Sequence, residues 1–212
     1  TSLSKINTTV SANFTSEGII NGKVRQVFDN YFGLNYRSSV TDTSIESQIE
    51  SIEESNEFVK VSNLSNTNLE DISKPVMRSY DFKIESGFVD AIGDKLYISP
   101  MLYFATEENP FKEKTRSYPI DFTYPRASRV IFTIKIPEGY VVDYVPEKVA
   151  IGLPDNTGTF QYLAVANSEK IQVTVMTKIN ANILPATYYA SLKEFFQTIV
   201  EKENEKIVLK KS

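Results

Sequence analysis

The chain has 212 residues, of which 41% are hydrophobic and 24% charged, and its formal net charge is −4. It contains no Cys and no His, which excludes disulfides, thiolate nucleophiles, Ser-His-Asp and Cys-His arrangements, and nearly all zinc, haem and iron–sulfur sites. The modest acidity also argues against a general nucleic-acid binder, because such proteins carry a basic face. We therefore expect no cofactor, no metal and no nucleic-acid partner.

Aromatic residues are abundant, with 13 Phe and 12 Tyr, which favours β-strands. Charge is uneven along the chain: residues 1–109 carry 9 Lys/Arg against 16 Asp/Glu, and residues 110–212 carry 14 against 11. This asymmetry fits either two halves that dock or two solvated surfaces, and we favour the second interpretation. No apolar run is long enough to span a membrane. No signal peptide opens the sequence, whose first residue is Thr1, so we expect an excised or processed piece.

The first half of the chain reads as strands interrupted by one helix. Residues 5–14 form a polar strand, and Asn21-Gly22 between two apolar runs predicts a hairpin turn, because this pair tolerates positive φ. Residues 58–61 return to β structure, followed by a polar loop over 63–71. Residues 75–84 alternate as a half-buried strand.

A helix is predicted over about residues 43–55. Thr43 and Glu46 have the spacing of a capping box, and isoleucines recur at helical intervals behind them. The remaining face is acidic, with Glu46, Glu50, Glu53 and Glu54. We interpret this face as a solvated surface and not as a cation or partner site.

The next segments contain a hairpin and a candidate linker. Residues 88–98 predict a hairpin that turns at Gly93-Asp94. Residues 105–117 are polar, charged and broken by Pro110, so they form either a linker or a long surface loop.

From residue 118 onward, short β-rich runs are separated by Pro and Gly. The predicted strands cover 129–136, 140–144, 148–153, 159–166 and 171–179. Pro137-Glu-Gly and Pro154-Asp-Asn-Thr-Gly are predicted turns. A helix over about 186–203 has a wide apolar stripe, which we expect to pack on its own sheet and not on a partner or membrane. Residues 206–210 close the chain as a predicted edge strand.

This pattern predicts a mainly β protein, an antiparallel β-sandwich of jelly-roll kind with two accessory amphipathic helices. We predict one large domain over 1–212 with sub-regions 1–109 and 110–212. The alternative is two small β domains divided near 105–117.

No motif for catalysis is present. The eight glycines form neither a phosphate-binding loop nor a nucleophile elbow, and no calcium-binding loop occurs. Paired carboxylates can hydrolyse glycosidic bonds without His or Cys, but 27 acidic residues identify no particular pair. Aromatic side chains that stack on sugars are another option, although most aromatic residues fall at core positions. We assign no catalytic, cofactor-binding or metal-binding residue.

Several segments resemble one protein family. Tyr118-Pro-Ile-Asp-Phe-Thr-Tyr-Pro-Arg, Ile136-Pro-Glu-Gly-Tyr, Leu153-Pro-Asp-Asn and the end of the chain are similar to the C-terminal β domain, of unknown function, of bacterial transglutaminase-like proteins and candidate proteases. Ser79-Tyr-Asp-Phe and Gly93-Asp-Lys-Leu-Tyr resemble the region that precedes it. The resemblance covers most of the chain and is distributed along it.

The resemblance implies an exported protein, periplasmic or extracellular, in which a papain-like core precedes this region. The Cys and His of such a core have no counterpart here, so no catalytic residue is carried over. We expect a non-catalytic accessory module that supports the core or its recognition of substrates or partners, with upstream domains of the same polypeptide as its partners. The oligomeric state is left open. The alternatives are a carbohydrate- or peptide-binding β-sandwich and a hydrolase that uses paired carboxylates.

Overall fold

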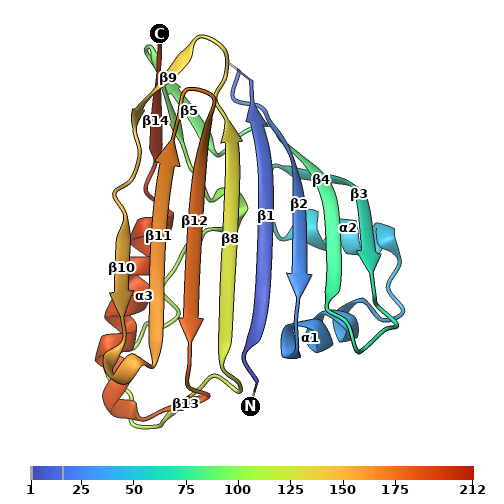
Figure 1. Ribbon diagram of the computed structural model, residues 1–212, viewed down its shortest axis with the longest axis vertical. Coiled ribbons are helices and arrows are strands. Elements are labelled where there is room, and N and C mark those ends of the chain that lie inside the picture. Colours follow the sequence, from blue (N-terminus) through green and yellow to red (C-terminus); the bar gives the residue numbers. More distant parts are fainter. Residues whose placement is uncertain (1, 16) are drawn as a thin grey trace.

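The structure is a computed structural model that describes residues 2–15 and 17–212. The predicted mainly β fold is confirmed. Eight strands form one wide twisted sheet, and the helices and a four-stranded sheet lie against one of its faces, behind it in Figure 1. The other face of the large sheet is uncovered and is called the open face below.

The large sheet joins strands from both halves of the chain. Its strands follow the order β10 (Val149–Gly152), β11 (Gly158–Ala166), β12 (Lys170–Ile179), β8 (Arg126–Lys135), β1 (Ser4–Phe14), β2 (Ile20–Phe28), β4 (Val76–Ile84) and β3 (Val59–Thr67). Neighbours are antiparallel except β1 and β8, which run parallel from Ser4 beside Arg126 to Asn13 beside Lys135. The parallel pair is not predicted from the sequence. The jelly-roll form stays a prediction.

The smaller sheet is built from segments that are distant in the sequence. Its strands follow the order β5 (Val89–Ile92), β6 (Lys95–Ile98), β14 (Ile207–Lys211) and β9 (Tyr140–Tyr144), and β7 (Ile120–Asp121) pairs with β13 (Ile183–Leu184). The hairpin turn at Gly93-Asp94 is confirmed. The prediction of a terminal edge strand is wrong, because β14 lies between β6 and β9. Its Lys210 makes an ion pair with Asp143 of β9.

Both predicted helices are confirmed. The helices are α1 (Tyr31–Val40), α2 (Ile45–Glu54) and α3 (Tyr189–Glu203), with single 3-10 turns η1 (Leu102–Phe104), η2 (Pro154–Asn156) and η3 (Ala186–Tyr188). The capping box is displaced by one residue: Ser44 is the N-cap of α2, and its hydroxyl accepts a hydrogen bond from the Ser47 N–H at 3.1 Å. Helix α1 is not predicted from the sequence.

Helix α1 is held mainly by contacts with distant segments. It buries only Gly33 and Tyr36, and the Tyr36 ring stacks on Phe28 at 4.5 Å. The Arg37 guanidinium donates to the carbonyls of residues 68, 69, 71 and 74. These bonds fix the segment after β3, which itself extends to Thr67, so the polar loop predicted from residue 63 begins later than expected.

The core lies between the large sheet and its cover. Several inward positions of β8 and β12 are fully buried, including Phe132, Ile134 and Val173. They belong to one hydrophobic cluster with Leu209 of β14 and Leu192 of α3. Burial of each such side chain contributes roughly 1.5–3 kcal/mol. Because alternate strand residues face opposite sides, the same pattern sends the intervening polar residues to the open face.

The predicted turn at Asn21-Gly22 is wrong. Both residues lie inside β2, opposite Asn13 and Ala12 of β1. The reason is packing: a Cβ on Gly22 would lie 2.3 Å from the Ser11 carbonyl oxygen and 2.4 Å from the Phe82 ring. Gly22 therefore makes room for an aromatic ring, and the chain reverses instead near Gly18, whose φ is 84°.

The segment 105–117, predicted as a linker or surface loop, runs along α3. Lys193 donates to the carbonyls of Lys112 and Glu113 at 3.0 and 2.8 Å. Phe111 contacts the rings of Tyr189 and Phe196. The segment is thus anchored on α3 by both polar and aromatic contacts. Whether the chain forms one domain stays a prediction, which a proteolysis experiment below addresses.

Candidate functional site

The open face carries far more positive than negative charge, which the net charge of the chain does not indicate. Within the described strands of the large sheet, its outward positions carry nine cations and one carboxylate, that of Asp81. The cations are Lys5, Lys23, Arg25, Lys60, Lys83, Arg129, Lys135, Lys170 and Lys178. A chain of net charge −4 therefore presents a strongly basic surface on one side. The modest net charge of the sequence does not reveal this surface.

Three of these cations have carboxylate partners. Lys23 contacts Asp81 at 3.3 Å, Lys60 contacts Glu53, and Lys83 contacts Glu85. The Asn63 side chain, and after it Lys23, lowers the pKa of Asp81. These pairs lie on the side of the sheet formed by β2, β4 and β3, where the face is locally balanced.

The other six cations make no ion pair with a described residue. They occupy β2, β1, β8 and β12, in the middle of the sheet. Lys5, Arg129 and Lys178 gather at one end of these strands, and we call them the basal trio. Lys135 and Lys170 lie opposite each other at the other end, and we call them the groove pair. On β12, eight residues separate Lys178 of the basal trio from Lys170 of the groove pair, or roughly 26 Å at the rise of a β-strand.

Apolar side chains lie beside these cations. Leu163 and Val165 of β11 and Met176 of β12 are 44%, 50% and 38% exposed. Met176 is opposite Arg129 across the β12–β8 pair. The other outward strand positions that the structure describes hold Ser, Thr, Asn and Gln, a few small or partly buried apolar residues such as Val27, Met77 and Ile131, and no aromatic side chain.

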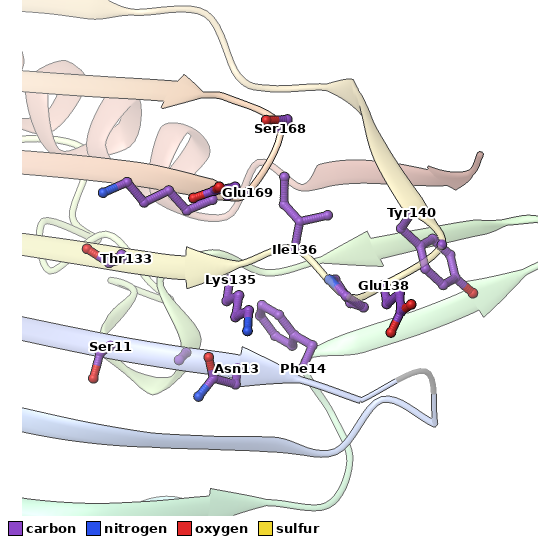
Figure 2. Close-up of a pocket in the computed structure, with 14 residues that line it drawn as sticks. Ser11, Asn13, Phe14, Thr133, Lys135, Ile136, Glu138, Tyr140, Ser168 and Glu169 are labelled. Atoms are coloured by element: carbon purple, nitrogen blue, oxygen red, sulfur yellow. The ribbon is translucent and has the colours of Figure 1, made fainter.

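The groove pair lines a groove with a volume of about 950 Å³. It surrounds the ends of β1, β8 and β12, where the chain turns at 137–140 and 168–170. Asn13 and Lys135 are opposite each other on neighbouring strands (Figure 2), while Phe14 and Ile136 are buried and Tyr140 packs against the core. The outer side of the groove is therefore lined by charged and polar side chains, and its inner side is apolar.

The groove contains two carboxylates, Glu138 and Glu169, both exposed. No cluster of three or more acidic side chains able to hold a metal occurs within residues 2–15 and 17–212. Lys135 and Lys170 make no ion pair with a described residue, so their ammonium groups can still receive an anion although two carboxylates share the groove. The predicted turn at Pro137-Glu-Gly precedes β9, and the predicted turn at Pro154-Asp-Asn-Thr-Gly leads into β11. Both connect strands, as the sequence indicates.

Sequence reasoning missed the open face for a definable reason. Its six cations without an ion pair to a described residue are spaced along four strands in three separate parts of the chain, and each of these strands contributes only one or two of them. Alternation in each strand indicates which residues are outward, but the order of strands decides that these particular outward residues become neighbours. The order depends on the parallel β1–β8 pair, which local pattern does not reveal.

The comparisons place the chain in a family. Residues 94–209, more than half of the chain, match the domain of unknown function with a solved structure that is designated DUF3858, and the chain belongs to this family. A comparison with curated proteins finds no match. Among solved structures, a candidate protease from Parabacteroides distasonis is similar with a TM-score of 0.40 and 14% identity, over 46% of this chain and 19% of that one. The chain thus spans about a fifth of the length of that protein.

A search for membrane-crossing helices is negative for the described part of the chain, where no helix has the required length and apolar character.

Proposed function

We propose that this chain is a non-catalytic accessory module that docks through its open face onto an acidic surface of another protein domain. The observation that carries the proposal is the group of six cations in the middle of the open face that make no ion pair with a described residue. The sequence resemblance suggests the partner: a transglutaminase-like core in the same polypeptide.

Electrostatics favours an anionic partner. Like charges placed directly opposite in neighbouring strands destabilise a sheet, and Lys135 and Lys170 have this arrangement. Such a pair costs stability in the free chain and gains it when carboxylates approach. Cations of this kind also accelerate encounter with an acidic surface and fix its orientation.

The size and composition of the face favour a protein over other polyanions. The separation of the groove pair from the basal trio matches the diameter of an interface that buries about 800 Å² on each partner. Exposed Leu163, Val165 and Met176 supply the apolar contact that such interfaces have near their centre. Single-stranded nucleic acids and sugars are usually bound by aromatic stacking, and the outward strand positions offer no aromatic ring.

The non-enzymatic character and the exported location are parts of the proposal. The absence of Cys and His from the sequence supports the first. The second rests on the resemblance alone. The alternative of a carbohydrate- or peptide-binding site has the 950 Å³ groove in its favour, where Tyr140 lies on the wall.

The experiment expresses the proposed core separately and measures its binding to this chain by calorimetry. The double variant Lys135→Glu/Lys170→Glu is compared with Lys114→Glu, an exposed lysine outside the large sheet. We expect binding that weakens with added salt, at least tenfold weaker binding for the double variant, and no change for Lys114→Glu. Equal affinity of all three proteins, or no binding of the unaltered chain, contradicts the proposal.

A further inference from the structure

A second cavity lies on the covered side of the large sheet, away from the open face. Its volume is about 360 Å³, and its walls come from β1, β8 and β12, from the segment around η1, and from α3. Most of the lining is apolar, including Met101, Phe104, Val175, Phe196 and Ile199. Sites of this kind, apolar with a few polar groups, are the usual form of a small-molecule pocket.

One carboxylate lies in this wall. Glu203, in the last turn of α3, is 6% exposed, and one of its oxygens accepts a hydrogen bond from the Thr106 N–H at 2.8 Å. Within the described residues it makes no ion pair, and its neighbour Lys202 pairs with Glu205 instead. The Arg126 side chain also lines the cavity, but its guanidinium lies over the Phe122 ring at 4.9 Å.

This placement is costly for the free protein. A carboxylate removed from water without a cation loses solvation that one hydrogen bond does not replace. Burial accordingly raises the pKa of Glu203. The C-terminal end of a helix adds to the cost, because carbonyl dipoles there disfavour a negative charge.

We propose that this cavity binds a small amphiphilic amine, whose ammonium group pairs with Glu203 and whose apolar body occupies the space between α3 and the large sheet. The ammonium group supplies the missing countercharge and donates to the carboxylate oxygens. The volume accommodates roughly ten non-hydrogen atoms at about 30 Å³ each. The cavity and the open face lie on opposite sides of the sheet, so this proposal is independent of the docking proposal.

The test uses three probes of similar size that differ in the head group: 2-phenylethylamine, 2-phenylethanol and 3-phenylpropanoate. Binding to the whole chain is measured by calorimetry and by ligand-detected NMR. We expect the amine to bind more tightly than the alcohol by at least tenfold and the carboxylate to bind least. Equal binding of amine and alcohol, tightest binding of the carboxylate, or no binding of the amine overturns the proposal.

Two variants locate the amine. Glu203→Gln keeps an oxygen that accepts from Thr106 and removes the charge, and Glu201→Gln changes an exposed residue of the same helix. Ser128→Leu fills the cavity from β8 while the carboxylate stays. Amine affinity should fall at least tenfold in Glu203→Gln and in Ser128→Leu and stay unchanged in Glu201→Gln. Unchanged affinity in Glu203→Gln, in a protein with the circular dichroism of the unaltered chain, rejects the site.

Discussion

Lys135 and Lys170 are directly opposite each other in the antiparallel pair of β8 and β12. Neither makes an ion pair with a described residue, and both line the groove at the end of the sheet. Repulsion between the two ammonium groups lowers the stability of the free sheet. The acidic partner that we propose would relieve this repulsion on binding.

The first prediction follows from this pair. Lys135→Glu places opposite charges across the two strands, so the free energy of unfolding should rise by about 0.2–1 kcal/mol. Urea denaturation at low salt measures the change, and high salt should reduce it. Lys114→Glu, the matched control, should leave stability unaltered. A lower stability of Lys135→Glu would contradict the prediction and would mean that Lys135 itself stabilises the sheet.

The second prediction concerns pH. The folded-state pKa of Glu203 is raised, so its ionisation costs no stability below the unfolded pKa. The cost grows as pH rises from the unfolded pKa to the folded pKa, and it is constant above the folded pKa. Glu203→Gln should therefore melt at the same temperature as the unaltered chain near pH 4 and at a higher temperature near pH 7. Arg126 is the other ionisable group of the cavity wall.

Thermal denaturation by circular dichroism, in steps from pH 4 to pH 8, measures the difference. A variant that is less stable at pH 7 than at pH 4, relative to the unaltered chain, would show that the ionised carboxylate supports the fold.

The third prediction tests why Gly22 lies within a strand. Gly22→Ala should lower the free energy of unfolding by about 1–3 kcal/mol, because the added methyl group meets the Ser11 carbonyl and the Phe82 ring. Gly152→Ala, in β10, is the matched control, since its nearest atom would be 3.6 Å away. Chemical denaturation compares the two variants. An equal effect of both would indicate that the packing of Phe82 is not the cause.

The fourth prediction addresses domain organisation. Because residues 105–117 contact α3 through Phe111, Asn109 and the Lys193 bonds, we expect this segment to resist limited proteolysis in the native chain. If it is cut under harsher conditions, the two fragments should stay together on gel filtration, held by the β1–β8 pair. Fragments that separate and stay folded would favour two small domains.

Much of the fold follows from local pattern, and the failures are informative. Strands such as residues 75–84 and 171–179 are identified by the alternation of apolar and polar residues, because one face of each strand is buried and the other is exposed to solvent. The prediction of a turn at Asn21-Gly22 is wrong because Gly22 makes room for the ring of Phe82, which lies on another strand. Helix α1 is not predicted because contacts with distant residues stabilise it, namely the hydrogen bonds of Arg37 and the stacking of Tyr36 on Phe28.

The candidate sites depend still more on tertiary structure. The sequence shows each lysine of the open face but not that Lys135 and Lys170 are neighbours, since 34 intervening residues separate them along the chain. Glu203 has the spacing of the apolar stripe of α3, yet only the packing of residues 101–106 against that helix encloses it. Charge patterning along the sequence therefore gives no direct indication of either site.

The measurement that tests the docking proposal most directly is a lysine footprint. Amine-reactive labelling, followed by mass spectrometry of peptides, is carried out on the free chain and on the chain mixed with the separately expressed core. If the open face docks on the core, we expect Lys5, Lys135, Lys170 and Lys178 to become protected while Lys114 and Lys211 stay reactive. Protection of Lys114 and Lys211 with the open face still reactive would contradict it.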